Sequence, residues 1–314
     1  MSSQKLTGRI LFGINNIFTV DSDNKLYECR IKGKVFRQSE GLYNPLAAGD
    51  IVDFERDSHS DFHGVITSVH ERKNAFTRWN RKRMAVQLIA SNIDILFCMA
   101  SPDDPPFRPR FLDRLMLTEE KSYQTVVLLN KTDLEISSQT RERLEDYERI
   151  GIRVLKCSAK THEGIDQLKE LIDGRQCAFA GHSGVGKSSV INILTGSETQ
   201  KTSEISYKYN RGKHTTNYSI LIPLGTGSII DTPGIRDIFI KKVEPVKLSR
   251  MFIDFVPYIH KCGFSGCSHI AETDCAVKKA VETGKIHYDR YETYLKLYSE
   301  MTEISEEIYG PAYS

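Results

Sequence analysis

The stretch Gly181-His-Ser-Gly-Val-Gly-Lys-Ser188 fits the phosphate-loop pattern G-x-x-x-x-G-K-[ST]. It follows an apolar segment of strand character, 177–180, and precedes a helical run, 189–194. Glycines let such a loop wrap a phosphate with its backbone N–H groups, at a helix N-terminus whose dipole favours anions. Lys187 is expected to reach the β- and γ-phosphates, and the Ser188 hydroxyl to bind Mg²⁺. The alternative, a glycine turn without function, produces this pattern in this context in roughly one case in a hundred.

The motif Asp231-Thr-Pro-Gly234 follows another segment of strand character, 228–230. A carboxylate at the end of a strand can hold Mg²⁺ through water, and the Gly234 N–H can sense the γ-phosphate. Taken alone, D-x-x-G is usually only a turn. It becomes informative here because a phosphate loop precedes it in the chain.

Two further motifs indicate which base is bound. Asn130-Lys-Thr-Asp133 ends the predicted strand 125–129, and Ser158-Ala-Lys160 ends the predicted strand 152–157. Asp133 can accept two hydrogen bonds from the ring N–H and amino group of guanine, a pattern that adenine cannot supply. Short motifs arise often by chance, but four of them at the carboxyl ends of strands predict a guanine-nucleotide site. The residues expected to bind GTP are Asn130, Lys131, Thr132, Asp133, Ser158, Ala159, Lys160, Gly181, His182, Ser183, Gly184, Val185, Gly186, Lys187, Ser188, Ser189 and Asp231.

The order of these motifs is unusual. In ordinary GTPases the phosphate loop comes first, whereas here N-K-x-D and S-A-K precede it and D-x-x-G ends the series. A circular permutation preserves the contacts of a site as long as the old chain ends can be bridged. The short link Asp173-Gly-Arg175 is the expected bridge.

The remaining sequence predicts a multi-domain protein, since 314 residues exceed the usual size of one core. Residues 1–70 read as short strands with turns between them, which favours a small barrel, and an OB-fold is one option. From about residue 91, strands alternate with amphipathic helices, which indicates a parallel, helix-covered sheet. Past about residue 244 the chain is expected to be helical, with a break at Gly284. The predicted strands and helices of the central part are 93–100, 111–122, 125–130, 139–150, 152–157, 163–172 and 176–181.

Composition argues against a disordered, fibrous or membrane-spanning protein. The chain is 39% hydrophobic and 27% charged, as in ordinary globular proteins, and its 43 Lys and Arg nearly balance 41 Asp and Glu. The longest apolar stretch, 93–100, is far shorter than the ~20 residues that cross a bilayer. The first residues have no apolar signal-peptide core, so we expect a cytoplasmic protein.

The seven cysteines divide into two groups. Four stand singly in apolar runs and are expected to be buried free thiols rather than a disulfide framework. They are Cys29, Cys98, Cys157 and Cys177. The other three form a cluster with one histidine, which suits a closed, structural Zn²⁺ site with no open catalytic position. Its expected ligands are Cys262, Cys267, His269 and Cys275, and three free thiols beside a surface histidine are the alternative.

These features together resemble the RsgA (YjeQ) family of circularly permuted small ribosomal subunit biogenesis GTPases. The resemblance covers nearly the whole chain and includes Ala48-Gly-Asp50, 66–78, 91–94 and 212–216. It implies an OB-fold-like, RNA-binding barrel at 1–72, a permuted GTPase domain at 73–243 and a zinc-binding helical domain at 244–314. It also implies GTP and GDP as ligands, Mg²⁺ with GTP, and the small ribosomal subunit and its rRNA as partners. We separately expect no membrane partner and a monomeric protein.

Residues 196–217 have the polar composition of a switch loop, in which Thr215 or Thr216 would bind Mg²⁺ when the γ-phosphate is present. The residue after Gly234 is Ile235, where Ras-like enzymes place a glutamine that orients water. An alkyl side chain cannot do so, and slow intrinsic hydrolysis is therefore expected. By resemblance the small subunit would complete the site, with His214 as a candidate for orienting water; a solvated loop histidine is the equal alternative.

RNA binding has weaker support from the residues themselves. Six basic residues lie in 72–83 together with Phe76 and Trp79, which suits phosphate contacts and stacking, whereas a solvated linker is the alternative. Aromatic and apolar residues at helical spacing near the C-terminus are expected to be core: Tyr288, Tyr291, Leu295 and Tyr298. Two rival functions remain open, namely an assembly scaffold that holds GTP as a structural ligand and a signalling GTPase that acts on proteins.

Overall fold

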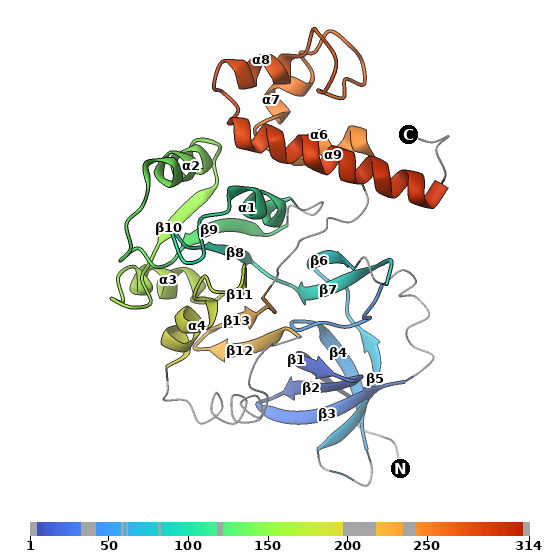
Figure 1. Cartoon of the computed structure of the whole chain (residues 1–314). Helices are drawn as coiled ribbons and strands as arrows, with labels where there is room; N and C mark the ends of the chain where they lie inside the picture. Colours follow the sequence, from blue (N-terminus) through green and yellow to red (C-terminus); the bar gives the residue numbers. More distant parts are fainter. Residues whose placement is uncertain are drawn as a thin grey trace.

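The computed structural model describes residues 5–32, 42–57, 60, 62–80, 83–117, 122–196, 218–234 and 243–309. Figure 1 shows an N-terminal barrel, a central sheet covered by helices and a helical C-terminal part. These three parts confirm the fold class that the sequence predicts. The C-terminal helices lie on the side of the central sheet away from the barrel (Figure 1).

The N-terminal part is a closed five-stranded barrel. Its strands are β1 (Lys5–Ile14), β2 (Ile17–Ser22), β3 (Lys25–Ile31), β4 (Ile51–Arg56) and β5 (His63–Val69). The barrel closes because β1 pairs with both β2 and β4, while β3 pairs with β5 in parallel. Alternate residues point inward, and the core contains Ile10, Val20, Phe54 and Ile66, all fully buried.

The segment Ala48-Gly-Asp50 fixes the barrel to the central sheet. Gly49 has a left-handed backbone (φ 96°), and a Cβ there would lie 2.3 Å from the carbonyl oxygen of Ser91. The buried Asp50 carboxylate accepts hydrogen bonds from Arg72 Nε (2.7 Å) and Nη2 (2.9 Å). Gln176, at the start of a central strand, donates from Nε2 to the Ser91 carbonyl (2.7 Å). Only glycine can adopt this turn without a clash.

The basic stretch after the barrel forms a β-hairpin of β6 (Ala75–Asn80) and β7 (Ala85–Ser91). Phe76 is buried in the main core, and Arg78 donates from Nε to Gln87 on the opposite strand (3.0 Å). A solvated linker is therefore wrong for 75–80.

The central sheet has the strand order β10-β9-β8-β11-β13-β12. Its strands are β8 (Ile95–Ala100), β9 (Gln124–Leu129), β10 (Arg153–Lys156), β11 (Gln176–Gly181), β12 (Ile220–Leu224) and β13 (Gly227–Asp231). All neighbours are parallel except β12 and β13. The four motifs of the sequence thus lie together at the carboxyl ends of the parallel strands.

Helices cover both faces of this sheet (Figure 1). They are α1 (Pro109–Met116), α2 (Ser138–Arg149), α3 (Ile165–Ile172) and α4 (Lys187–Thr195). Helices α1 and α2 bury Leu112 and Leu144 in one core, and α3 and α4 bury Leu168 and Ile191 in the other. The predicted helix 111–122 is too long, because α1 ends at Met116 and the next residue is extended.

The C-terminal part contains α6 (Pro245–Met251), α7 (Val256–Ile259), α8 (Ala276–Glu282) and α9 (Tyr288–Tyr309). Gly284 lies between α8 and α9, and its left-handed backbone (φ 69°) separates the two helices as predicted. Helix α9 spans 22 residues, yet among the described residues no helix is long and apolar enough to cross a membrane.

The predicted aromatic core of α9 is correct for three residues and wrong for one. Tyr291, Leu295 and Tyr298 pack against the C-terminal core, but Tyr288 is 63% exposed. Tyr288 is the first residue of α9, before the stripe that faces the protein. That stripe is formed by Arg290, Thr293, Tyr294, Leu297 and Met301, all buried.

Candidate functional site

The phosphate loop connects β11 to the start of α4, as its sequence predicts. Gly184 and Gly186 have left-handed backbones (φ 89° and 84°), and α4 begins at Lys187. A Cβ on Gly186 would lie 2.3 Å from Asn130 Nδ2, so glycine is required there. The loop therefore presents backbone N–H groups at a helix N-terminus, the geometry that binds phosphate.

Asn130 connects three of the motifs. Its Nδ2 donates to the Val185 carbonyl in the phosphate loop (2.9 Å), and its Oδ1 accepts from the Ala159 N–H (3.0 Å). The residue is buried, so both contacts are shielded from water. Asn130 thus holds the N-K-x-D and S-A-K segments against the phosphate loop, although the chain order is permuted.

Asp133, the residue expected to read the base, is held by two neighbours from the S-A-K motif. The Ser158 hydroxyl donates to Asp133 Oδ1 (2.6 Å), and Lys160 Nζ lies 3.7 Å from Oδ2. The hydrogen bond from Ser158, aided by the charge of Lys160, lowers the pKa of Asp133. The side chain is thus kept ionised, as an acceptor for two N–H groups must be. Lys131 has a left-handed backbone (φ 63°), and its Nζ donates to the carbonyl of Asp104.

The residues expected to bind Mg²⁺ lie where the phosphate loop meets the end of β13. Lys187 Nζ and Asp231 Oδ1 form a largely buried ion pair. The Ser188 side chain is exposed at the start of α4. A Cβ on Gly234 would lie 4.0 Å from the Ser183 Cβ, so D-T-P-G borders the phosphate loop.

Three predicted residues of the switch loop, His214, Thr215 and Thr216, lie outside the described residues, as does Ile235. The structure also brings a segment to the site that motif reasoning did not single out. Arg108, in the proline-rich loop after β8, is hydrogen-bonded to His182 of the phosphate loop (2.9 Å). The only signal in the sequence was the run of prolines.

The cysteine cluster has the geometry of a tetrahedral metal site. The ligand atoms of Cys262, Cys267, His269 and Cys275 lie within 4.8 Å of one another. Cys262 Sγ is 4.0 Å from Cys275 Sγ, and His269 Nδ1 is 3.6 and 3.4 Å from these two sulfurs. Zn–S and Zn–N bonds of about 2.3 and 2.0 Å place neighbouring ligands about 3.5–3.8 Å apart, so the cluster fits Zn²⁺. Within the described part of the chain it is the one group of this kind.

Comparison with known families agrees with the family resemblance found in the sequence. The RsgA GTPase model matches residues 69–241, and the RsgA N-terminal domain model matches residues 7–66. The chain belongs to the RsgA family. Among curated relatives, a protein of Borreliella burgdorferi is 39% identical over 93% of this chain and 95% of its own length. One of Chlorobaculum tepidum is 40% identical over 90% and 93%. Both are named small ribosomal subunit biogenesis GTPase RsgA.

Two solved structures share the fold of this chain. YjeQ from Thermotoga maritima is 30% identical, with a TM-score of 0.71 over 95% of this chain and 99% of that one. YloQ, described as a circularly permuted GTPase, is 26% identical, with a TM-score of 0.68 over 96% of both chains. This RsgA-family chain is therefore a circularly permuted GTP hydrolase.

Proposed function

We propose that this GTPase binds the small ribosomal subunit, acts late in its maturation and hydrolyses GTP with stimulation by the subunit. The observation that carries the proposal is the full-length match to relatives named for small ribosomal subunit biogenesis, which includes the barrel as well as the GTPase motifs. A signalling GTPase would have no need of the barrel. The basic stretch 72–83 and the barrel are the proposed contacts with rRNA.

We further propose that the predicted GTP-binding residues act as their motifs imply. Asp133 would read the guanine, and the backbone of 181–188 would hold the phosphates. Ser188, Asp231 and either Thr215 or Thr216 would hold Mg²⁺, and the cysteine cluster would hold one structural Zn²⁺. Bound Mg²⁺ would offset the charge that develops on the phosphates.

The chain's own residues prepare the site in three ways. Lys187, paired with Asp231, is held near the phosphate loop and would turn to the β- and γ-phosphates. Asn130 keeps the base-reading and phosphate loops in register. Gly234 would sense the γ-phosphate through its N–H. No water-orienting glutamine follows Gly234, so hydrolysis by the free protein is slow, and a partner or His214 completes the site.

The three proposed units are 1–72, 73–243 and 244–314, in a protein that works as a monomer in the cytoplasm. Each unit has a separate task in this proposal: contact with rRNA, binding of nucleotide and docking through the zinc-binding helices. GTP would hold the protein on the subunit, and hydrolysis would release it.

Co-sedimentation with purified ribosomal subunits tests the binding part of the proposal. We expect the chain to pellet with small subunits in a non-hydrolysable GTP analogue and to remain in solution with GDP. Large subunits are the control for specificity, and Lys187→Ala is the control for dependence on nucleotide. Equal binding to both subunits, or none to the small subunit, would contradict the proposed partner.

A further inference from the structure

The loop between β8 and α1 packs against the nucleotide-binding loops. A Cβ on Gly184 of the phosphate loop would lie 3.2 Å from Pro105 Cδ, so the Pro105 ring lies against the backbone of Gly184. Lys131 of the N-K-x-D motif donates from Nζ to the Asp104 carbonyl. The segment 101–108 thus contacts both the loop that would hold phosphates and the loop that would read the base.

Arg108, at the N-cap of α1, contacts the phosphate loop through His182. Arg108 Nη1 is 2.9 Å from His182 Nε2, and His182 Nδ1 is 2.9 Å from the Ser183 carbonyl oxygen. A carbonyl only accepts, so the ring proton lies on Nδ1 and Nε2 accepts from the guanidinium. The edge of His182 also meets the ring of Phe111 at 82°, with centroids 5.7 Å apart. Arg108 at the N-cap and Phe111 within α1 therefore fix the orientation of the His182 ring.

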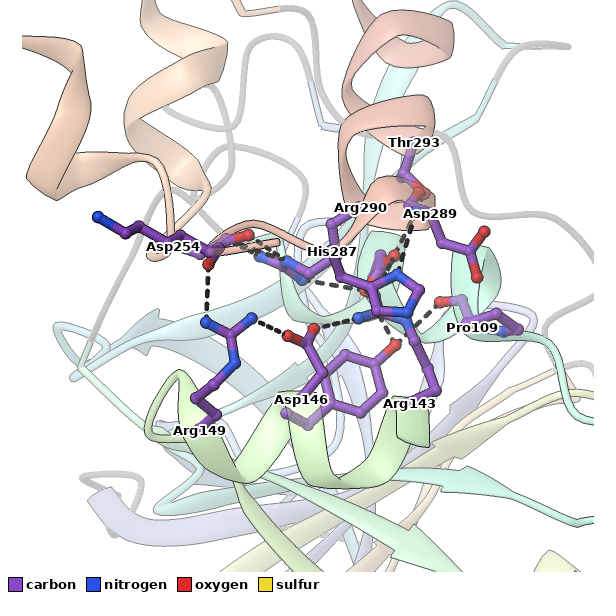
Figure 2. Close-up of polar contacts among 12 residues, drawn as sticks. Pro109, Arg143, Asp146, Arg149, Asp254, His287, Asp289, Arg290 and Thr293 are labelled. Carbon is purple, nitrogen blue, oxygen red and sulfur yellow. Dashed lines mark hydrogen bonds and ion pairs between the residues drawn. The ribbon is translucent and has the colours of Figure 1, made fainter. Parts of the chain in front are cut away.

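The middle of α1 is anchored by a buried cluster of charges between α1, α2 and α9 (Figure 2). Asp113 of α1 is fully buried and accepts from Arg143 of α2 (2.9 and 3.0 Å) and from Arg290 of α9 (3.0 Å). The Tyr147 hydroxyl (2.9 Å) and the Thr293 hydroxyl (3.2 Å) also donate to it. Burial raises the pKa of Tyr147 well above its ordinary value, so the phenol remains a donor.

Helix α9 extends this connection to the cysteine cluster. Arg290 also donates from Nε and Nη2 to Asp254, which precedes α7 (2.6–3.0 Å). The Tyr291 hydroxyl donates to the His269 carbonyl (2.7 Å), and the Tyr294 hydroxyl to the Ser268 carbonyl (2.5 Å). The metal-binding loop, α9 and α1 are thus joined by side chains that are mostly buried.

Two more ion pairs join α1 to α9 at the rim of the charge cluster. Arg110 pairs with Glu292, and Arg114 pairs with Glu300. Breaking a buried ion pair is costly, whereas rim pairs contribute little stability, so the rim pairs can be removed without unfolding the interface.

We propose that Arg108 is a positioning residue for the phosphate loop, and that α1 makes this position depend on how α9 and the cysteine cluster dock on the GTPase sheet. A buried cluster of complementary charges favours one arrangement of the two parts. Asp113 and Arg108 belong to one short helix and its N-cap, so a change in docking at Asp113 is carried to Arg108 and His182. Because coupling is reciprocal, the state of the phosphate loop also changes the docking of α9.

Nucleotide affinity of the free chain tests the role of Arg108 and needs no ribosomal subunit, so failure of the proposed partner would not affect it. We expect Arg108→Ala to weaken GDP and GTP binding by about 3- to 10-fold, as loss of one partly exposed hydrogen bond allows. Arg108→Lys should restore most of the affinity, because it returns a donor to His182. Arg153→Ala is the matched control, because Arg153 is exposed at the start of β10, an edge strand of the central sheet. Unchanged affinity in Arg108→Ala would overturn the proposal.

A double-mutant cycle with His182→Ala tests whether Arg108 acts through this ring. We expect Arg108→Ala to change the affinity less than 2-fold in the His182→Ala background, since the contact is already lost. Additive effects would overturn the proposed route. Amide exchange of 182–186 should be faster in Arg108→Ala than in the parent chain without nucleotide, and equal exchange would also contradict it.

Removal of the rim pairs tests the connection to α9. We expect Glu292→Gln with Glu300→Gln to weaken nucleotide binding about 2- to 5-fold, at the lower end of ordinary allosteric coupling, with zinc content unchanged. The effect should vanish in the Arg108→Ala background. An effect of the same size in both backgrounds, or none in either, would show that α1 does not couple the two parts.

Discussion

Asn130 donates a hydrogen bond from Nδ2 to the carbonyl of Val185 at 2.9 Å, which joins the base-reading loop to the phosphate loop. In the chain Asn130 comes first, the reverse of the order in ordinary GTPases. The contact is possible because β9 and β11 both flank β8 and end at the same edge of the sheet. Permutation has changed the connections and kept the site.

The proposed recognition of guanine by Asp133 predicts a change of base preference in Asp133→Asn. The amide would keep one acceptor for the ring N–H but would place a donor opposite the amino group of guanine. We expect GTP affinity to fall about 100-fold or more, since two hydrogen bonds to a charged group are altered. Xanthosine triphosphate, which has a carbonyl in place of that amino group, should bind the variant better than GTP does.

The measurement is competition of the two triphosphates against a fluorescent nucleotide. Asp166→Asn, at an exposed carboxylate on α3, should leave the preference for GTP intact. A parent-like preference for GTP in Asp133→Asn would rule out the assigned role.

The proposed binding of Mg²⁺ by Asp231 predicts a shift in the Mg²⁺ dependence of hydrolysis. Asp231→Asn removes the carboxylate that would hold Mg²⁺ through water and also breaks the ion pair with Lys187. We expect the Mg²⁺ concentration for half-maximal single-turnover hydrolysis to rise about 10-fold or more, as loss of a charge-assisted contact implies. An unchanged Mg²⁺ titration would contradict the assignment.

The cysteine cluster predicts that metal and folding are linked in the C-terminal part. Cys262→Ser should lower the zinc content from one equivalent to well below it and should lower the melting temperature, because a structural zinc contributes on the order of 10 kcal/mol. Metal analysis and thermal unfolding measure both effects. Cys177→Ala, at a buried thiol in β11, should keep one equivalent of zinc. If both variants kept it, the cluster would not be the metal site.

A carboxylate in the barrel predicts a loss of stability in acid. The pKa of Asp53 lies well below its usual range, chiefly because His70 hydrogen-bonds to it (2.9 Å), with help from Ser68, Thr7 and Lys5. A lowered folded-state pKa gives stability above the unfolded-state value of about 3.9, and this stability is lost as the pH falls below it.

Asp53→Asn should therefore melt at a lower temperature than the parent chain at pH 7, and the difference should shrink as the pH falls from about 4 toward about 2. Asp23→Asn is the control, because Asp23 is exposed in a turn with a left-handed backbone that asparagine also adopts. A difference that stayed constant with pH would contradict the role of the Asp53 charge.

The convergence of the four motifs was predictable because each motif is local. Each motif directly follows a strand, and parallel strands bring their carboxyl ends together whatever the order of the chain. The cysteine cluster was equally local, with all four ligands close in sequence. The barrel was predictable from its short strands and the turns between them.

The rest depended on contacts between distant segments. The hairpin β6–β7 was hidden because its basic residues resemble a solvated linker, and its strand character appears only in the pairing of Phe76 with Ala90. From the sequence alone, Arg290 would be expected on the surface of α9. Its burial depends on the ion pair with Asp113, which is distant in the sequence. Arg108 has no motif at all, and only the packing of α1 brings it to His182.

GTP turnover with purified small subunits is the most direct test of the central claim, with large subunits as the control. The account predicts slow turnover by the free chain and stimulation of 10-fold or more by small subunits alone, within the range that a partner completing the site can give. Turnover that stayed at the basal rate while the chain bound small subunits would contradict it and would favour an assembly scaffold that only holds GTP.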